Sequence, residues 1–256
     1  MKPTAQIIGT PSLSPKSPVI IGYSVEGRPI EVFQMGTGPN AIVLVGGIHG
    51  GYETNTVILL RQIITRLQAS TAIPPDISVY IIPAMNPDGQ EKEKMAGRVN
   101  ANGVDLNRNW GCDWIGNEGY YYGQYYNTGS EAFSEPETQH VHEFILSVKA
   151  VVTVFYHSRG EFIFYGECSE TFGSKQFAEF MSNATGYPLY NPPASFGDAE
   201  QTPITGDATN YLDSIGIRAI GIELSSHDVN DVDLERNYTG VLATFDFVRE
   251  IASQNR

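Results

Sequence analysis

The chain has 256 residues, of which 41% are hydrophobic, and it carries a formal net charge of −13 at pH 7. This length and apolar content suit a single α/β domain with one large core, and they exclude an intrinsically disordered chain. The acidic surface disfavours nucleic acid and anionic membranes as partners, because their phosphates would be repelled. We therefore expect neither nucleic acid nor a membrane among the partners.

The N-terminal segment shows no targeting signal. Residues 1–17 are polar and rich in Pro, and they lack the apolar core of a signal peptide. The protein is therefore expected to be cytoplasmic, or extracellular or periplasmic if a signal was removed. We expect residues 1–22 to form an N-terminal extension and residues 23–256 to form one folded domain.

The two cysteines leave two readings open. Cys112 and Cys168 could form one disulfide in an oxidising compartment, or remain two buried thiols.

Hydrophobic patterning predicts strands that alternate with helices. A hairpin is predicted over residues 23–33, followed by strands at 41–45, 77–82, 150–155, 162–165 and 219–224, with helices at 54–68, 134–148, 174–185, 208–214 and 234–253. Residues 90–135 have little periodicity and are predicted to be a long functional loop region. This alternation predicts a largely parallel or mixed sheet with helices on both faces.

Three of these strands carry residues that can bind a metal or move a proton. His49 and Glu53 follow the first, His157 follows the strand at 150–155, and Glu223 lies inside the last. Two imidazoles and one carboxylate are the ligand set of a catalytic zinc site, which keeps its fourth position open for water. A further carboxylate is then needed as general base, and Glu223 fits because burial among apolar neighbours raises its pKa.

Six segments match one enzyme family in the correct order. They are Gly46-Gly-Ile-His-Gly50, Asn86-Pro-Asp-Gly89, Arg98-Val-Asn-Ala-Asn-Gly-Val-Asp-Leu-Asn-Arg-Asn-Trp110, Ser134-Glu-Pro-Glu-Thr138, His157-Ser158 and Gly221-Ile-Glu-Leu224. On these segments the chain resembles the zinc metallocarboxypeptidases of the funnelin type, which include carboxypeptidases A, B and E and bacterial murein-peptide relatives. The resemblance runs from about Tyr23 to the closing helix. It implies one catalytic domain over residues 23–256, with a mixed, twisted sheet of about eight strands flanked by helices.

The resemblance also implies roles for the strand-end residues. His49, Glu53 and His157 look like the ligands of one Zn²⁺ per chain, and Glu223 looks like the general base and acid. The family spacing between the first two ligands is His-x-x-Glu, whereas this chain has one extra residue in His49-Gly-Gly-Tyr-Glu53. Because Gly tolerates unusual backbone angles, a looser turn can absorb this residue, and Glu53 remains the expected ligand.

Three further residues match the substrate-binding positions of the family. Arg98 looks like the arginine that polarises the scissile carbonyl, and Asn107 and Arg108 look like the pair that grips a C-terminal carboxylate. An arginine suits bidentate carboxylate recognition. The implied partner is a peptide with a free C-terminal carboxylate.

The specificity positions depart from the family pattern. An ungapped count from Glu223 places Gln201 where the family has a substrate-capping tyrosine, and Tyr190 or a tyrosine of residues 120–126 is the alternative. Asp207 lies beside the expected floor of the side-chain pocket, and Arg159 follows the second histidine ligand. Together they would suit a zwitterionic side chain such as meso-diaminopimelate, although both fit equally well as surface residues without a substrate role.

The function expected from the resemblance is zinc-dependent hydrolysis of the C-terminal peptide bond, with cell-wall stem peptides as one substrate class. Two alternatives stay open. The first is a zinc-dependent deacylase of N-acyl amino acids, and the second is an inactive zinc-binding or peptide-binding module.

Overall fold

The computed structural model describes residues 17–254, except 117, 122–123, 169–172 and 191–204. In these residues the main sheet has seven strands in the order β1-β2-β4-β3-β7-β9-β8. They are β1 (Val19–Tyr23), β2 (Pro29–Gly36), β3 (Asn40–Val45), β4 (Ile77–Ile82), β7 (Ala150–Ser158), β8 (Phe162–Tyr165) and β9 (Arg218–Leu224). This mixed sheet confirms the predicted fold class.

The centre of the sheet is parallel and its margins are antiparallel. Strands β4, β3, β7 and β9 pair in parallel, while β1, β2 and β8 join as antiparallel strands. The carboxyl ends of the parallel strands therefore meet at one edge of the sheet. Open α/β sheets bind their ligands at this edge.

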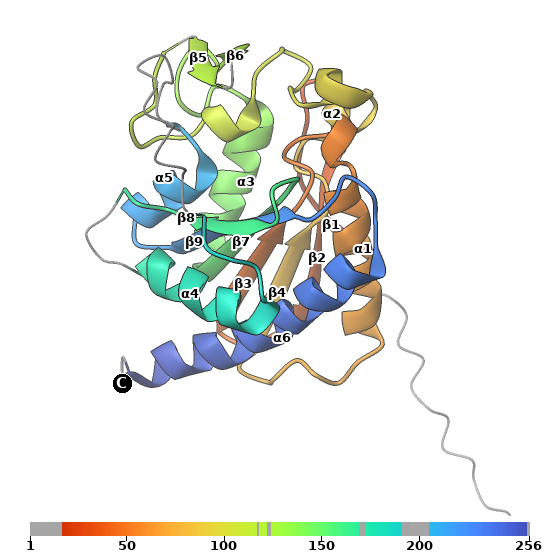
Figure 1. Cartoon of the computed structure of the whole chain (residues 1–256), viewed down its shortest axis with the longest axis vertical. Helices are drawn as coiled ribbons and strands as arrows, with labels where there is room; N and C mark the ends of the chain where they lie inside the picture. The colour runs from red at the N-terminus through yellow and green to blue at the C-terminus, as the bar shows by residue number, and fades with distance from the viewer. Residues whose placement is uncertain (1–16, 117, 122–123, 169–172, 191–204, 255–256) are drawn as a thin grey trace, which may run out of the picture.

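Helices cover both faces of the sheet (Figure 1). They are α1 (Asn55–Gln68), α2 (Pro87–Gln90), α3 (Pro136–Ser147), α4 (Gly173–Thr185), α5 (Ala208–Ser214) and α6 (Asp231–Gln254). Helices α1, α4 and α6 pack in the core cluster that contains Ile42 and Leu44, whereas α3 and α5 pack in the cluster that contains Val43 and Val45. Successive side chains of a strand point to opposite faces, so β3 contributes to both cores.

The first strand of the sheet begins inside the expected N-terminal extension of residues 1–22. β1 begins at Val19 and pairs with β2, and the first pair in this register is Val19 with Val32. Residues 19–22, expected in an N-terminal extension, therefore belong to the sheet. The turn between the two strands lies within the hairpin predicted over residues 23–33, but the first strand begins earlier, at Val19.

The stretch predicted as a loop at 90–135 contains regular structure. It holds the 3₁₀ turns η2 (Lys94–Gly97) and η3 (Leu106–Arg108) and the antiparallel hairpin of β5 (Glu118–Tyr121) and β6 (Gln124–Asn127). The hairpin projects beyond the main sheet at the end of the molecule where α2 also lies (Figure 1). The loop prediction was therefore wrong for these segments.

None of the helices in the described part of the chain is long and apolar enough to cross a membrane.

Candidate active site

The carboxyl ends of β3 and β7 bring three donor groups together. His49 follows β3, Glu53 closes the 3₁₀ turn η1 (Gly51–Glu53), and His157 lies within β7, which runs to Ser158 rather than ending at 155. One donor atom from each of the three lies within 4.8 Å of the others, and all three residues are buried. The donor set predicted from the sequence is therefore assembled in the fold.

The Glu53 carboxylate lies between the two histidines. Its Oε1 is 2.9 Å from His49 Nδ1, and its Oε2 is 3.3 Å from His157 Nδ1. Two nitrogens and a carboxylate that converge in a buried site are the donors that zinc prefers. A site of this composition fits the metal that the sequence resemblance implies.

Two glycines explain how the extra residue before Glu53 is accommodated. A Cβ on Gly50 would lie 2.1 Å from the carbonyl oxygen of Gly89, and a Cβ on Gly51 would lie 1.9 Å from that of Lys94. Gly51 also has φ of +60°, which disfavours other residues. The additional residue is thus taken up by a 3₁₀ turn pressed against neighbouring backbone, and Glu53 still reaches both histidines.

Asp105 holds the other side of His49. Its Oδ1 lies 3.0 Å from His49 Nε2, and its Oδ2 accepts hydrogen bonds from Arg98 Nε at 3.0 Å and Nη2 at 2.8 Å. Burial disfavours the charged form of Asp105, but Arg98 and His49 outweigh that effect and hold its pKa well below the usual range. An ionised Asp105 favours the proton on Nε2 of His49, which leaves Nδ1 as the donor to a metal.

Neighbouring groups also determine the protonation states of Glu53 and His157. Burial opposes the ionised form of Glu53, but His49 and the hydrogen bond with His157 outweigh this effect and keep its pKa far below the usual value. For His157, burial is the largest influence and lowers the pKa. The site therefore presents an ionised Glu53 and a neutral His157, the forms that bind metals. Burial disfavours the charged form of His49, but the Glu53 charge outweighs it and raises the pKa, so a metal would displace a proton from this imidazole.

Glu223 differs from Glu53 in its protonation. It lies in β9 and pairs in register with His157 on β7. Burial, followed by the nearby Glu53 charge, raises the pKa of Glu223 to about 8. Its Oε2 is buried and finds no hydrogen-bond partner among the described residues. Such a carboxyl can accept and release a proton near neutral pH.

The residues expected to bind substrate lie at different places. Asn107 and Arg108 are buried in η3, where Asn107 Oδ1 accepts a hydrogen bond from Ala208 N at 3.1 Å and Arg108 Nη1 donates to Asn107 O at 2.6 Å. Asp207 is the N-cap of α5, and its carboxylate accepts bonds from Thr209 and Asn210. Arg159 is exposed. Asp207 is thus occupied in capping a helix.

The position of a capping tyrosine is only partly described. Gln201 and the side chains of residues 120–125 lie outside the described part of the chain. Tyr190 packs its ring on Phe162, with 4.7 Å between the ring centroids. Tyr126 lies over Arg98. Tyr126 therefore contacts a residue of the site.

A second layer of side chains had no role in the sequence interpretation. Ser158 N donates to Glu53 Oε2 at 3.3 Å, and Ser158 Oγ donates to Asn55 Oδ1 at 2.8 Å. His227, given no role from sequence, lies with Nδ1 3.2 Å from Ser158 Oγ. Ser158 lies in the quoted segment His157-Ser158, whereas no local signal distinguishes Asn55 or His227, because these segments meet only in the fold.

The cysteines form the Cys112–Cys168 disulfide. The bridge joins the segment after η3 to the segment after β8, and Gly206 N donates to Cys112 O at 3.2 Å. It therefore links the segment that follows Asn107 and Arg108 to the segment that follows β8.

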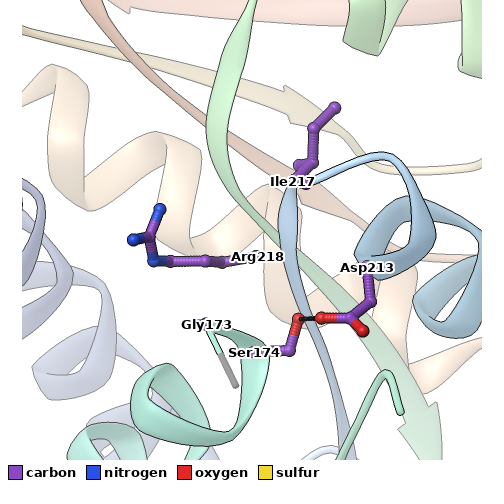
Figure 2. Close-up of a pocket in the computed structure, with 6 residues that line it drawn as sticks. Gly173, Ser174, Asp213, Ile217 and Arg218 are labelled. Carbon is purple, nitrogen blue, oxygen red and sulfur yellow. Dashed lines mark hydrogen bonds between the residues drawn. The ribbon is translucent and has the colours of Figure 1, made fainter. Parts of the chain in front are cut away.

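A small cavity of about 170 Å³ lies apart from this site. It is lined by Gly173, Ser174, Asp213, Gly216, Ile217 and Arg218. Figure 2 shows Ser174 bonded to Asp213 and the Arg218 side chain extending away from that pair. Arg218 opens β9 and Glu223 lies five residues later, so about 16 Å of strand separates the cavity from the metal-binding residues.

Comparison with known proteins agrees with this geometry. The sequence profile described as zinc carboxypeptidase matches residues 14–223. The chain belongs to the zinc carboxypeptidase family. Carboxypeptidase E of Caenorhabditis elegans is 35% identical over 113 residues, which cover 35% of this chain and 24% of that protein. The chain thus matches about a quarter of the length of this relative.

Solved structures show the same fold. Murein-tripeptide amidase MpaA from Escherichia coli O157 superposes with a TM-score of 0.65 at 24% identity, covering 90% of this chain and 92% of that one. Bovine thrombin-activatable fibrinolysis inhibitor, solved in complex with tick carboxypeptidase inhibitor, superposes with a TM-score of 0.73 at 19% identity, covering 92% of each chain. At these identities the likeness concerns the fold.

Proposed function

We propose that this protein is a zinc-dependent carboxypeptidase in which His49, Glu53 and His157 hold one Zn²⁺. One observation carries the proposal. The three buried donors converge beside Glu223, a carboxyl with a raised pKa and no hydrogen-bond partner for Oε2 among the described residues. A spare carboxyl next to a complete ligand set is the arrangement that metal-assisted hydrolysis requires.

The residues of the chain divide the chemistry between them. A bound zinc ion would polarise the substrate carbonyl and lower the pKa of water. Glu223 takes a proton from the attacking water and returns it to the leaving amine. Arg98 directs its Nη1 group towards the Glu53 side of the site, at 3.8 Å from Oε1, where it can donate to the developing oxyanion.

Asn107 and Arg108 supply the exopeptidase specificity in this account. The guanidinium of Arg108 is a rigid, planar donor group suited to a carboxylate. Asn107 is fixed by bonds to Asp105 and to Ala208 N, so the clamp stays at a set distance from the metal-binding residues. Such a distance would select the last peptide bond of a chain with a free C-terminus.

The proposed substrate preference concerns the peptide class and the side chain at its C-terminus. Cell-wall stem peptides are the class to test first, because a protein of this fold carries the name murein-tripeptide amidase. The engagement of Asp207 in capping α5 weighs against this residue as the acid that reads a basic side chain. Exposed Arg159 stays the proposed contact for a second substrate carboxylate.

The Cys112–Cys168 bridge supports an oxidising compartment as the place of action. Disulfides persist in secreted and periplasmic proteins and are rare in the cytosol. We therefore favour the extracellular or periplasmic alternative over the cytoplasmic one.

The test is a panel of peptides that end in Lys, Arg, Phe, Glu or diaminopimelate, read by mass spectrometry. We expect loss of one C-terminal residue from at least one free-acid peptide, and no cleavage of its C-terminal amide. Cleavage of N-acyl amino acids without cleavage of peptides would assign the deacylase alternative. Binding of zinc with no hydrolysis in either set would assign the inactive module.

A further inference from the structure

Among the described residues, Asp105 holds the guanidinium of Arg98 along one edge by hydrogen bonds. Nε and Nη2 both donate to Asp105 Oδ2, while Nη1 faces the Glu53 carboxylate at 3.8 Å. Both bonds end on one oxygen atom, so they restrain the guanidinium plane less than two separate acceptor atoms would. The contact of Nη1 with Glu53 is longer than a hydrogen bond, so a further contact would define the direction of Nη1 more closely.

The guanidinium carbon of Arg98 lies over the face of the Tyr126 ring. The ring centroid lies 4.7 Å from Arg98 Cζ, within the range of cation–π contacts. Arg98 has only 19% of its side chain exposed, so the contact is partly shielded from water. The planar, weakly hydrated guanidinium is well suited to stacking on an aromatic face.

The fold fixes this ring relative to Asp105. Asp105 N donates to Asn127 O at 2.9 Å, and Asn127 also forms a bridge with Val104. Tyr126 immediately precedes Asn127 at the end of β6. This backbone contact thus fixes the position of Tyr126 relative to Asp105, the residue that binds the edge of Arg98.

We propose that Tyr126 is a positioning residue for Arg98: its ring fixes the guanidinium plane so that Nη1 is presented to the reacting carbonyl. The proposal rests on the carboxypeptidase function proposed above. The ring, rather than the hydroxyl, performs this role. Loss of the ring should therefore slow the chemical step and leave substrate binding largely unchanged.

The test compares Tyr126→Phe, which keeps the ring, with Tyr126→Leu, which removes it. A cation–π contact of the usual strength predicts that Tyr126→Leu lowers kcat by about 2- to 30-fold, with KM nearly constant. Tyr126→Phe should restore kcat to within about twofold of the parent enzyme on the same scale. In an Arg98→Ala background, Tyr126→Leu should have no further effect.

Tyr238→Leu is the matched control. Arg66 Cζ lies 5.3 Å from the Tyr238 ring centroid, a pair of the same kind on α6 and α1. Loss of the Tyr238 ring should leave kcat unchanged. Equal losses in Tyr126→Phe and Tyr126→Leu, a change confined to KM, or an additive loss in the Arg98→Ala background would each overturn the proposal.

A second readout separates this proposal from the carboxypeptidase function. NMR resonances of the Arg98 side chain should carry a ring-current shift that Tyr126→Phe keeps and Tyr126→Leu abolishes. If the parent protein hydrolyses no peptide, the proposed function fails and this shift still tests the contact. If the Arg98 resonances have the same chemical shifts in Tyr126→Leu as in the parent protein, the positioning role is overturned, whether or not the protein is active.

Discussion

Asp105 Oδ1 lies 3.0 Å from Nε2 of His49, on the opposite side of the ring from the Nδ1 atom that faces Glu53. The same aspartate holds Arg98 through its other oxygen. One buried carboxylate therefore orients both a metal-binding histidine and the arginine proposed to stabilise the oxyanion.

The first prediction concerns this aspartate. Asp105→Asn replaces one carboxylate oxygen by an amide and removes the charge that favours the Nε2 proton of His49. We expect zinc affinity to fall by about 10- to 100-fold, the usual effect of losing such a partner. Competition with a chelator of known affinity measures it.

Asp88→Asn is the matched control for Asp105→Asn. Asp88 is also buried and bonded to an arginine, Arg28, but it contacts Ser24 and Glu26 rather than the metal-binding residues. Its zinc affinity should stay at the parent value. Parent-like affinity in Asp105→Asn would mean that His49 is oriented by other contacts.

The second prediction concerns the proposed base. Glu223→Gln keeps the size of the side chain but cannot accept a proton from water. We expect turnover to fall by about 10²- to 10⁴-fold, the range for loss of general acid–base catalysis. The bound zinc, measured by elemental analysis of the same sample, should stay at one per chain. Retained turnover would refute the role of Glu223.

The third prediction follows from the pKa of Glu223 in the metal-free protein. This pKa is raised from 4.5 to about 8. Between pH 4.5 and pH 8 the folded protein therefore keeps a proton on Glu223 that the unfolded chain has released. The contribution of Glu223 to the free energy of unfolding is therefore intact below pH 4.5 and decreases as pH rises towards 8. Glu223→Gln lacks this dependence.

Urea unfolding of both metal-free proteins at two pH values checks the sign. The free energy of unfolding of Glu223→Gln, relative to that of the parent, should be greater near pH 8 than near pH 5. These two pH values span most of the range between the unfolded and folded pKa of Glu223. A difference that is the same at both pH values, or that decreases, would show that burial does not raise the pKa of Glu223. Comparing the two proteins cancels the other titrating groups.

The fourth prediction concerns the disulfide. Cys112 and Cys168 are 56 residues apart in the sequence, so the bridge restrains a long loop of the unfolded chain. Replacing both by Ser should lower the free energy of unfolding by about 2–4 kcal/mol. Denaturant titration measures it, and the parent protein with excess reductant should show a similar loss. Unchanged stability in both would place the bridge outside the folding unit.

Much of the fold follows from local pattern. The apolar run of β3, the helical spacing of α1 and the apolar strand around Glu223 are each visible in the sequence, and the structure has them within a few residues of the predicted positions. The order of family segments predicted the mixed sheet. These features depend on neighbouring residues, so sequence alone can identify them.

Other features depend on contacts between distant segments. The β5–β6 hairpin lies in a stretch without clear alternation, and it docks through Asn127 onto Asp105, 22 positions earlier in the chain. Asp105 lay inside a quoted motif, yet spacing alone gave no sign that it would touch both His49 and Arg98. The pairing of Cys112 with Cys168 likewise needed the fold.

Zinc titration of the metal-free protein, with a free-acid peptide that the parent enzyme cleaves, tests the proposed zinc-dependent hydrolysis. We expect no cleavage without metal and full activity at one equivalent of zinc, with a product shorter by one C-terminal residue. Cleavage that persists after metal removal, or its absence with one zinc bound per chain, would contradict the central claim.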